Sequence, residues 1–274
     1  MKLTWFDANS WLVEAANTRI LVDPWLIGDL VFGNTSWLVR GYRPDAITPP
    51  GDIDLILLSQ GLADHAHPET LDALDKSIPV IASPDGASVA QSHGYKTVTA
   101  VDHGGTIYLG PLGDGLGETS ADTATLKIQT FIGAPVGVTK KENAYVLTFL
   151  ETGNSLYYEP HGYPDAEHLK ALGAVDVVIT PMADITLMGI APVVNGKRVA
   201  PKLAELLTPQ VMLPTAEAGS AQYDGLMAGA IKSSGSAEDV RSQLRQKGLD
   251  TRVMNPKPRE TIQLDLKAAA PISS

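Results

Sequence analysis

Leu55-Ile-Leu-Leu-Ser-Gln-Gly-Leu-Ala-Asp-His-Ala-His67 is the stretch that decides the fold of this chain. It opens on four apolar residues, Leu55 to Leu58, which together with Asp54 before them predict a buried strand over Asp54 to Leu58. A short loop of small and polar residues follows, and Pro68 is typical of the first position of a helix. Because loops at the ends of buried strands present reactive groups on a rigid scaffold, we expect any chemistry to begin at Asp64 and the histidines beside it.

Composition narrows the class of protein. The chain has 274 residues, of which 44% are hydrophobic and 19% charged, as in ordinary globular proteins. Its net charge of -10 and the lack of clustered Lys and Arg argue against a nucleic-acid partner. There are no cysteines, so any metal ion must be held by histidines and carboxylates.

The N-terminal segment and the hydropathy of the chain predict its location in the cell. The N-terminal segment has no secretory pattern, and no stretch is apolar for long enough to span a bilayer. We therefore expect a cytoplasmic protein. We expect a single domain over residues 1–266 and a loose tail over residues 267–274, and the sequence leaves a homo-oligomer open.

Short predicted strands and helices alternate along the chain. The expected strands cover residues 2–6, 11–16, 19–23, 54–58, 79–83, 96–101, 106–109, 126–132, 144–151, 155–159, 175–181, 211–213 and 261–266. Helices are expected from residue 68 and over residues 86–92, 165–172, 201–207 and 237–247. The last of these is the clearest, because Ser236 can cap it and Glu238 and Asp239 lie in its first turn.

The central stretch resembles the metal-binding motif of the metallo-β-lactamase superfamily, His-x-His-x-Asp-His, which also joins a strand to a helix. Asp64 and His65 occupy its last two positions, whereas Gln60 and Leu62 stand where the family has histidines. The segment from Thr4 through the Asp23-Pro24 turn is similar to a branch that includes sugar-phosphate lactonases. The resemblance implies an α/β fold, an αββα sandwich of two mixed sheets face to face with outer helices, and the order of predicted elements agrees with it.

The resemblance also implies which metal ligands this chain lacks. In the family the two motif histidines and a third after a later strand hold a first metal ion. Here the third position falls in residues 133–137, which contain no ligand, and Leu62 cannot coordinate a metal. The degenerate motif therefore predicts that the first metal site is lost.

A second site in the family uses the Asp-His pair, a bridging aspartate and a final histidine. By this resemblance His161 stands at the bridging position, and the final position is Ala216, with Glu217 beside it. Asp64, His65 and His161 form a sensible set for one zinc, iron or manganese ion. Such an ion could activate water, with Glu159 or Glu217 to orient it. The alternative is metal-free: Asp64 turns the loop, and both histidines make ordinary hydrogen bonds.

Two features have alternative interpretations. His67 lies at the start of a predicted helix, where it could hydrogen-bond the backbone or turn towards a pocket lined by Gln60 and Leu62. The apolar segment from Trp25 to Leu38 fits a cluster under a long loop, or else a lid or dimer contact.

Two functions are consistent with these residues. The first is a hydrolase-like protein with at most one metal ion, acting on a small ester, lactone or phosphate. The second is a protein of the same fold that binds a small ligand or a partner without metal and without turnover.

Overall fold

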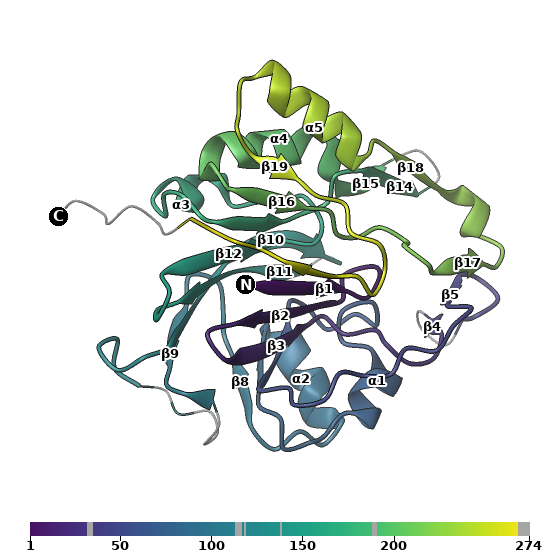
Figure 1. Ribbon diagram of the computed structural model, residues 1–274. Helices are drawn as coiled ribbons and strands as arrows, with labels where there is room; N and C mark the ends of the chain where they lie inside the picture. The colour runs from purple at the N-terminus through teal and green to yellow at the C-terminus, as the bar shows by residue number, and fades with distance from the viewer. Residues whose placement is uncertain (32–34, 113–116, 118, 138, 188–190, 268–274) are drawn as a thin grey trace.

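Two seven-stranded mixed sheets pack face to face and carry helices on their outer sides (Figure 1). The computed structural model describes residues 1–267 apart from residues 32–34, 113–116, 118, 138 and 188–190. The predicted αββα sandwich is confirmed. The predicted loose tail lies almost entirely outside the described residues, since only Lys267 of residues 267–274 is described.

The first large sheet has the order β20-β1-β2-β3-β6-β7-β8. Its strands are β1 (Lys2–Trp5), β2 (Trp11–Ala15), β3 (Thr18–Val22), β6 (Leu55–Leu58), β7 (Val80–Ala82), β8 (Val98–Ala100) and β20 (Thr261–Gln263). The opening meander is antiparallel, and from β3 to β8 the strands run parallel. Helices α1 (Pro68–Ala73) and α2 (Pro84–Ser92) cover its outer face.

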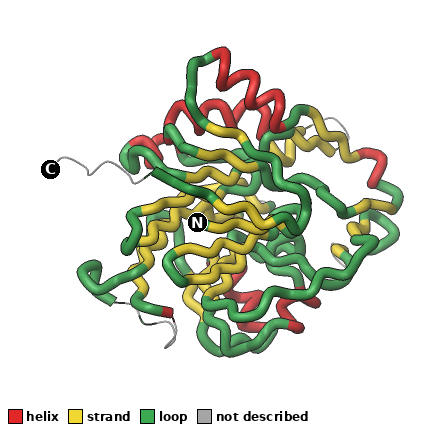
Figure 2. The backbone as a smooth tube through the Cα atoms, viewed as in Figure 1, coloured by secondary structure: helices red, strands yellow, loops and turns green. Residues whose placement is uncertain are grey.

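The second large sheet has the order β19-β16-β13-β12-β11-β10-β9. Its strands are β9 (Thr106–Leu109), β10 (Leu126–Val136), β11 (Lys140–Phe149), β12 (Asn154–Tyr158), β13 (Val177–Ile179), β16 (Val211–Leu213) and β19 (Arg252–Val253). Helices α3 (Ala166–Lys170), α4 (Gly196–Leu207) and α5 (Ala237–Gln246) lie on its outer side, so that strands occupy the middle of the molecule (Figure 2).

The central apolar run is buried on both of its faces. Leu55 and Leu57 belong to the core between the two sheets, whereas Ile56 and Leu58 pack under α1 and α2. Side chains alternate across a strand, so a parallel strand covered on both sides reads as continuous apolar sequence. This double burial explains why four consecutive apolar residues predict the strand correctly.

Two further sheets were not predicted from the sequence. One contains β4 (Leu30–Val31), β5 (Arg40–Tyr42) and β17 (Gln222–Asp224), and the other contains β14 (Asp184–Leu187), β15 (Ala191–Asn195) and β18 (Ile231–Ser234). A short 3-10 helix, η2 (Ala228–Ala230), connects β17 to β18. Both three-stranded sheets lie at the right-hand side of Figure 1, beyond the ends of the large sheets.

Several element boundaries differ from the predicted ones. The helix expected from Pro201 begins earlier, at Gly196, and the strand expected to end at Ile132 continues to Val136. Strand β11 also begins earlier than expected, at Lys140. Residues 133–136 therefore belong to β10 and do not form a loop after a strand. Pro135 and Val136 pair with Lys141 and Lys140, and a register shift lies between Ile132 and Pro135.

The apolar segment from Trp25 to Leu38 divides into a buried and an exposed part. Trp25 and Leu30 form a small buried cluster with Ala8 and Ala221. Trp37 is 65% exposed, and Phe32 lies outside the described residues. Trp25 and Leu30 are therefore core, as the cluster interpretation predicts, and Trp37 faces solvent.

His67 caps the first helix. It is the N-cap residue of α1, where its Nδ1 accepts from the backbone N–H of Thr70 at 3.4 Å, and its Nε2 lies 3.1 Å from the carbonyl of Asp29. Its ring packs 6.2 Å from that of Trp25. Burial lowers the pKa of His67 below its ordinary value, and a neutral ring is what an accepting Nδ1 requires.

Replacing this cap is expected to have a pH-dependent effect. His67→Ala should lower the free energy of unfolding by about 1 kcal/mol at pH 8. The pKa of His67 is lower in the folded protein than in the unfolded chain, where it is about 6.5. The contribution of His67 to the free energy of unfolding is therefore complete above pH 6.5 and is lost as the pH falls further. The difference from wild type should therefore shrink in acid. Urea unfolding at pH 8 and at a pH below 6.5 measures this difference. His168→Ala is the control, because the His168 side chain is 75% exposed. A difference that does not change with pH would contradict the cap assignment.

Candidate metal centre

Three candidate ligands converge between the edges of the two large sheets. Asp64 and His65 lie in the loop after β6, and His161 lies in the loop after β12. One ligand atom from each lies within 4.8 Å of the others. The two imidazole rings are 5.1 Å apart between centroids. The structure thus brings together the three residues that the sequence proposes as one metal-binding set.

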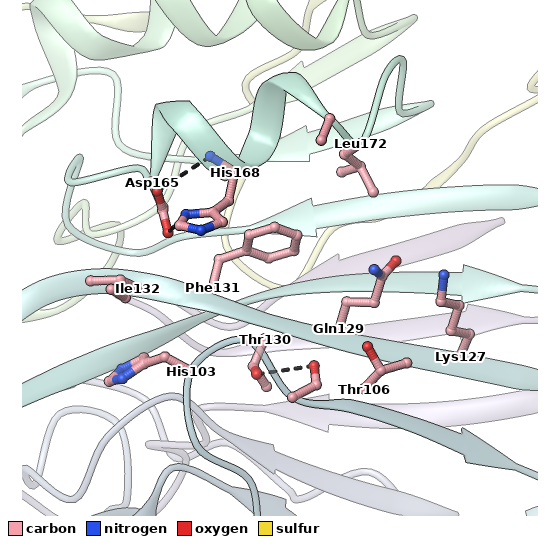
Figure 3. A pocket seen from close by; sticks show the side chains of 13 residues that line it. His103, Thr106, Lys127, Gln129, Thr130, Phe131, Ile132, Asp165, His168 and Leu172 are labelled. Atoms are coloured by element: carbon pink, nitrogen blue, oxygen red, sulfur yellow. Dashed lines mark hydrogen bonds and ion pairs between the residues drawn. The ribbon is translucent and has the colours of Figure 1, made fainter.

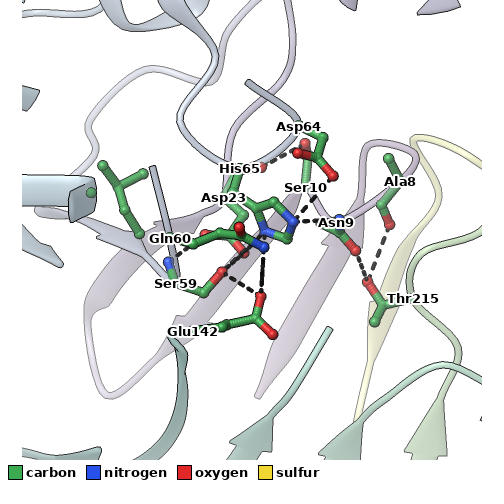
Figure 4. A network of polar contacts seen from close by, with 12 residues as sticks. Ala8, Asn9, Ser10, Asp23, Ser59, Gln60, Asp64, His65, Glu142 and Thr215 are labelled. Atoms are coloured by element: carbon green, nitrogen blue, oxygen red, sulfur yellow. Dashed lines mark hydrogen bonds and ion pairs between the residues drawn. The ribbon is translucent and has the colours of Figure 1, made fainter. Parts of the chain in front are cut away.

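Each of the two histidines has a buried carboxylate on its Nδ1. Asp23 Oδ2 lies 2.7 Å from His65 Nδ1, and both oxygens of Glu142 lie 3.0 Å from His161 Nδ1 (Figure 4 shows Asp23 and Glu142). A carboxylate on the second ring nitrogen is the usual partner of a metal-ligating histidine, because it fixes the ring orientation and the tautomer.

Asp23 is the centre of the larger hydrogen-bond network in Figure 4. Its carboxylate accepts from the Ser59 backbone N–H at 2.7 Å, the Ser59 hydroxyl at 2.5 Å and the Tyr158 hydroxyl at 2.6 Å, in addition to its contact with His65. The residue is fully buried and has a left-handed φ of 43°. Asp23 therefore joins the ends of β3, β6 and β12 at the site.

The charged groups of the cluster shift one another's pKa values. Burial opposes protonation of His65, but the carboxylates of Asp64 and Asp23 outweigh it and raise the pKa of His65 well above its ordinary value. Burial likewise opposes protonation of His161, and Glu142 raises the pKa of His161. Burial of Asp64 is outweighed by its two histidine neighbours, so the pKa of Asp64 is lowered. The pocket therefore favours positive charge next to its carboxylates.

Two buried oxygens at the site have no hydrogen-bond partner among the described residues. They are Asp64 Oδ1 and Gln60 Oε1. A buried acceptor without a partner costs about 1–3 kcal/mol, so such atoms indicate a missing donor or cation. Together with carboxylate-backed imidazoles, the Asp64 oxygen makes this donor set fit a metal ion of the kind that imidazole and carboxylate bind.

The two glutamates proposed to orient water have different surroundings. Glu159 is fully buried, and its carboxylate accepts from the backbone N–H groups of His161, Gly162 and Tyr163 at 2.9, 2.7 and 3.1 Å. Burial and the nearby Glu142 raise the pKa of Glu159 to about 7. Glu217 forms a backbone bridge with Ala8, and burial raises the pKa of Glu217. No hydrogen bond is found for its carboxylate among the described residues.

The residues proposed to line the pocket lie apart from one another. Gln60 is buried beside the cluster and donates through Nε2 to Glu142 Oε1 at 3.0 Å. Leu62 is 46% exposed and lines a separate hollow of about 280 Å³ with Asp85 and Val136. His67 points to the start of α1 and to Asp29.

Ala216, at the position where the resemblance to the family implies a final histidine, lies beside Ala8. The backbone N–H of Ala216 donates to the carbonyl of Ala8 at 3.1 Å. Both residues have left-handed backbone angles, with φ of 46° and 59°. Such angles are uncommon for residues other than glycine, and neither alanine side chain can coordinate a metal ion.

A hollow between α3 and the second large sheet lies away from the three ligands. It has a volume of about 480 Å³ and is formed between α3 and the strands β9 and β10, with Lys127, Gln129 and Phe131 in its wall (Figure 3). None of the three candidate ligands lines it. His103 connects the two regions, because its Nε2 lies 3.1 Å from the Glu142 carbonyl.

Asp23 and Glu142 are site residues that the sequence does not predict. Asp23 belongs to a turn in the sequence pattern, and Glu142 lies at the polar start of a strand whose predicted first residue is 144. A signal for Asp23 exists in its position directly after a buried strand, beside proline. For Glu142 no local signal exists, because its partners come from β6 and from the loop after β12.

Two facing mixed sheets with a histidine and aspartate cluster at their edge define a protein of the metallo-β-lactamase fold. A family model described as the beta-lactamase superfamily domain matches residues 2–216, and the chain belongs to that family.

Comparisons with known proteins give the same class. The chain is 25% identical over 217 residues to a UPF0173 metal-dependent hydrolase of Koribacter versatilis, covering 78% of this chain and 83% of that protein. It is 24% identical over 270 residues to one of Archaeoglobus fulgidus, covering 97% and 100%. A solved structure of a metallo hydrolase of Ignicoccus hospitalis shares the fold with a TM-score of 0.66 at 16% identity, covering 97% and 99%. Among the described helices, none has the length and apolarity that a bilayer crossing requires.

Proposed function

We propose that this protein is a metal-dependent hydrolase in which Asp64, His65 and His161 hold one zinc, iron or manganese ion. The observation that carries the proposal is that three ligand atoms converge within 4.8 Å, with a carboxylate behind each imidazole. The names of the curated relatives, metal-dependent hydrolases, support the reaction class. The proposed substrates are small esters, lactones or phosphates.

The ion, when bound, supplies a Lewis acid that activates water and polarises the substrate oxygen. The chain's own residues prepare this chemistry. Asp23 and Glu142 orient the two imidazoles, and Glu159 fixes the loop that carries His161 through three backbone N–H groups. We assign Glu159 this structural role because its oxygens are already occupied.

Glu217 is the better candidate to accept a proton from water. Its carboxylate has no hydrogen bond among the described side chains and backbone groups, and burial raises the pKa of Glu217, which makes its carboxylate a stronger proton acceptor. The residue pairs with Ala8, and the next residue, Asn9, contacts His65 at 3.2 Å. The backbone pairing with Ala8 supports a position of Glu217 near the proposed ligands.

One observation favours the alternative, a ligand-binding protein without metal. Asn9 Nδ2 lies 3.2 Å from His65 Nε2, which is the nitrogen that would face the ion. Asp64 Oδ2 lies 3.2 Å from the same atom. His65 therefore has partners on both nitrogens, and a metal ion would have to displace Asn9.

Metal content separates the two functions. Protein purified without chelator or polyhistidine tag should contain about one equivalent of zinc, iron or manganese by elemental analysis, and Asp64→Asn and His161→Ala should each lose it while remaining folded. His168→Ala is the matched control, because His168 is 75% exposed and paired only with Asp165. A folded wild type that binds none of the three metals, even when they are added, would exclude the hydrolase proposal.

A further inference from the structure

We infer that Glu142 is a positioning residue that selects the nitrogen which His161 offers to the metal ion. This inference rests on the proposed function, and its test is arranged so that the two can fail separately. Glu142 is fully buried in β11, and it contacts side chains from both large sheets.

The geometry fixes one orientation of the His161 ring. Both carboxylate oxygens of Glu142 lie 3.0 Å from Nδ1, so this nitrogen carries the proton and donates it. The lone pair then belongs to Nε2, which is left for the ion. A neutral imidazole has one donor and one acceptor nitrogen, and the hydrogen bond at one nitrogen decides what the other can do.

The same carboxylate also fixes the neighbouring amide. Gln60 Nε2 donates to Glu142 Oε1 at 3.0 Å, and the Ser59 hydroxyl lies 3.4 Å from the same oxygen. Gln60 Oε1 remains buried without a partner. Glu142 therefore connects the end of β6, which precedes Asp64 and His65, to the loop that carries His161.

The backbone opposite makes room for the carboxylate. A Cβ placed on Gly133 would lie 3.2 Å from both Cγ and Oε2 of Glu142, closer than ordinary van der Waals contact. The backbone N–H of Ala134 lies 3.4 Å from Oε2. The hairpin of β10 and β11 thus provides both the space and a donor for a charged group at this position.

A buried carboxylate in another part of the second large sheet provides a control for Glu142. Asp176 is also buried, and it accepts from the Ser155 backbone N–H at 2.8 Å and from Gln210 at 2.6 Å, far from the site in the β12 to β16 part of the sheet. Asp176→Asn is therefore the matched control for Glu142→Gln, since each replaces a buried carboxylate by an amide of the same shape.

Cobalt binding is the first test. Titration of metal-free wild type with Co²⁺, followed by visible absorption, should give one site, and Glu142→Gln should bind about 10–100-fold more weakly. Asp176→Asn should bind as wild type does. Equal affinity of wild type and Glu142→Gln would overturn the inference.

Nitrogen NMR of the imidazole rings is the second test and does not need a bound metal. At alkaline pH, ¹⁵N shifts assigned with the His161→Ala variant should show the proton on Nδ1 of His161 in wild type, and a mixture of the two tautomers in Glu142→Gln. If wild type binds neither cobalt nor zinc, iron or manganese, the proposed function fails, while this tautomer change still supports the positioning role. Identical His161 tautomers in wild type and variant would overturn it.

Discussion

Asp23→Ala should lower the free energy of unfolding by about 3–5 kcal/mol, the expected cost of removing one partner from a buried charged network. The carboxylate accepts three hydrogen bonds from Ser59 and Tyr158 and contacts His65 Nδ1 at 2.7 Å. All four residues are buried, so water cannot replace the lost acceptor. The variant leaves buried donors without partners and an imidazole without its counter-ion.

Chemical unfolding in urea measures this change. Asp54→Ala is a suitable control, because Asp54 accepts from the Arg19 backbone N–H at 2.7 Å in a partly buried position just before β6 of the same sheet. This substitution should cost about 1 kcal/mol. Tyr158→Phe removes one of the bonds to Asp23 and should fall between the two. If Asp23→Ala costs no more than Asp54→Ala, Asp23 is not the centre of the network.

The sequence predicts an element correctly where burial or capping leaves a local pattern in the chain. The strand Leu55–Leu58 is apolar throughout because both faces are covered, and Ser236 caps α5 by accepting from the Asp239 backbone N–H, as the sequence indicates. The two small sheets could not be predicted in this way. Strand β5 reads Arg-Gly-Tyr, and it pairs with β17, which lies far away in the chain, so the pairing leaves no local periodicity.

The candidate site could be predicted only in part for a related reason. The resemblance to a known motif singles out Asp64, His65 and His161, and the structure brings them together. The group that orients His161 reaches it only through the tertiary structure. Glu142 is 19 residues from His161 in sequence and 82 from Gln60. A buried carboxylate in a strand has no sequence signature, since its partners are defined only when the two sheets meet.

The ion pair of Arg43 with Asp7 is the second interaction for which we expect a large effect. Arg43 Nε lies 3.0 Å from Asp7 Oδ2, and the two side chains are 5% and 0% exposed. The guanidinium stacks 3.7 Å above the ring of Trp25 and donates to the Trp25 carbonyl at 2.7 Å. Arg43→Ala should cost about 3–5 kcal/mol, because it leaves the Asp7 carboxylate buried without its cation.

A double-mutant cycle of Arg43→Ala and Asp7→Ala measures the coupling. Asp7 also accepts from the backbone N–H and the hydroxyl of Ser220, at 2.8 and 2.6 Å, so it holds the segment after Glu217 against the site. The double variant should be more stable than the sum of the two single losses predicts, by about 1–3 kcal/mol, since neither charge is then left alone. Arg40→Ala is the control: its pair with Asp224 is 39% and 45% exposed, and such a pair contributes about 0–1 kcal/mol. Additive losses at Arg43 and Asp7 would mean that stacking on Trp25 and the bonds to Ser220 stabilise this wall independently of the ion pair.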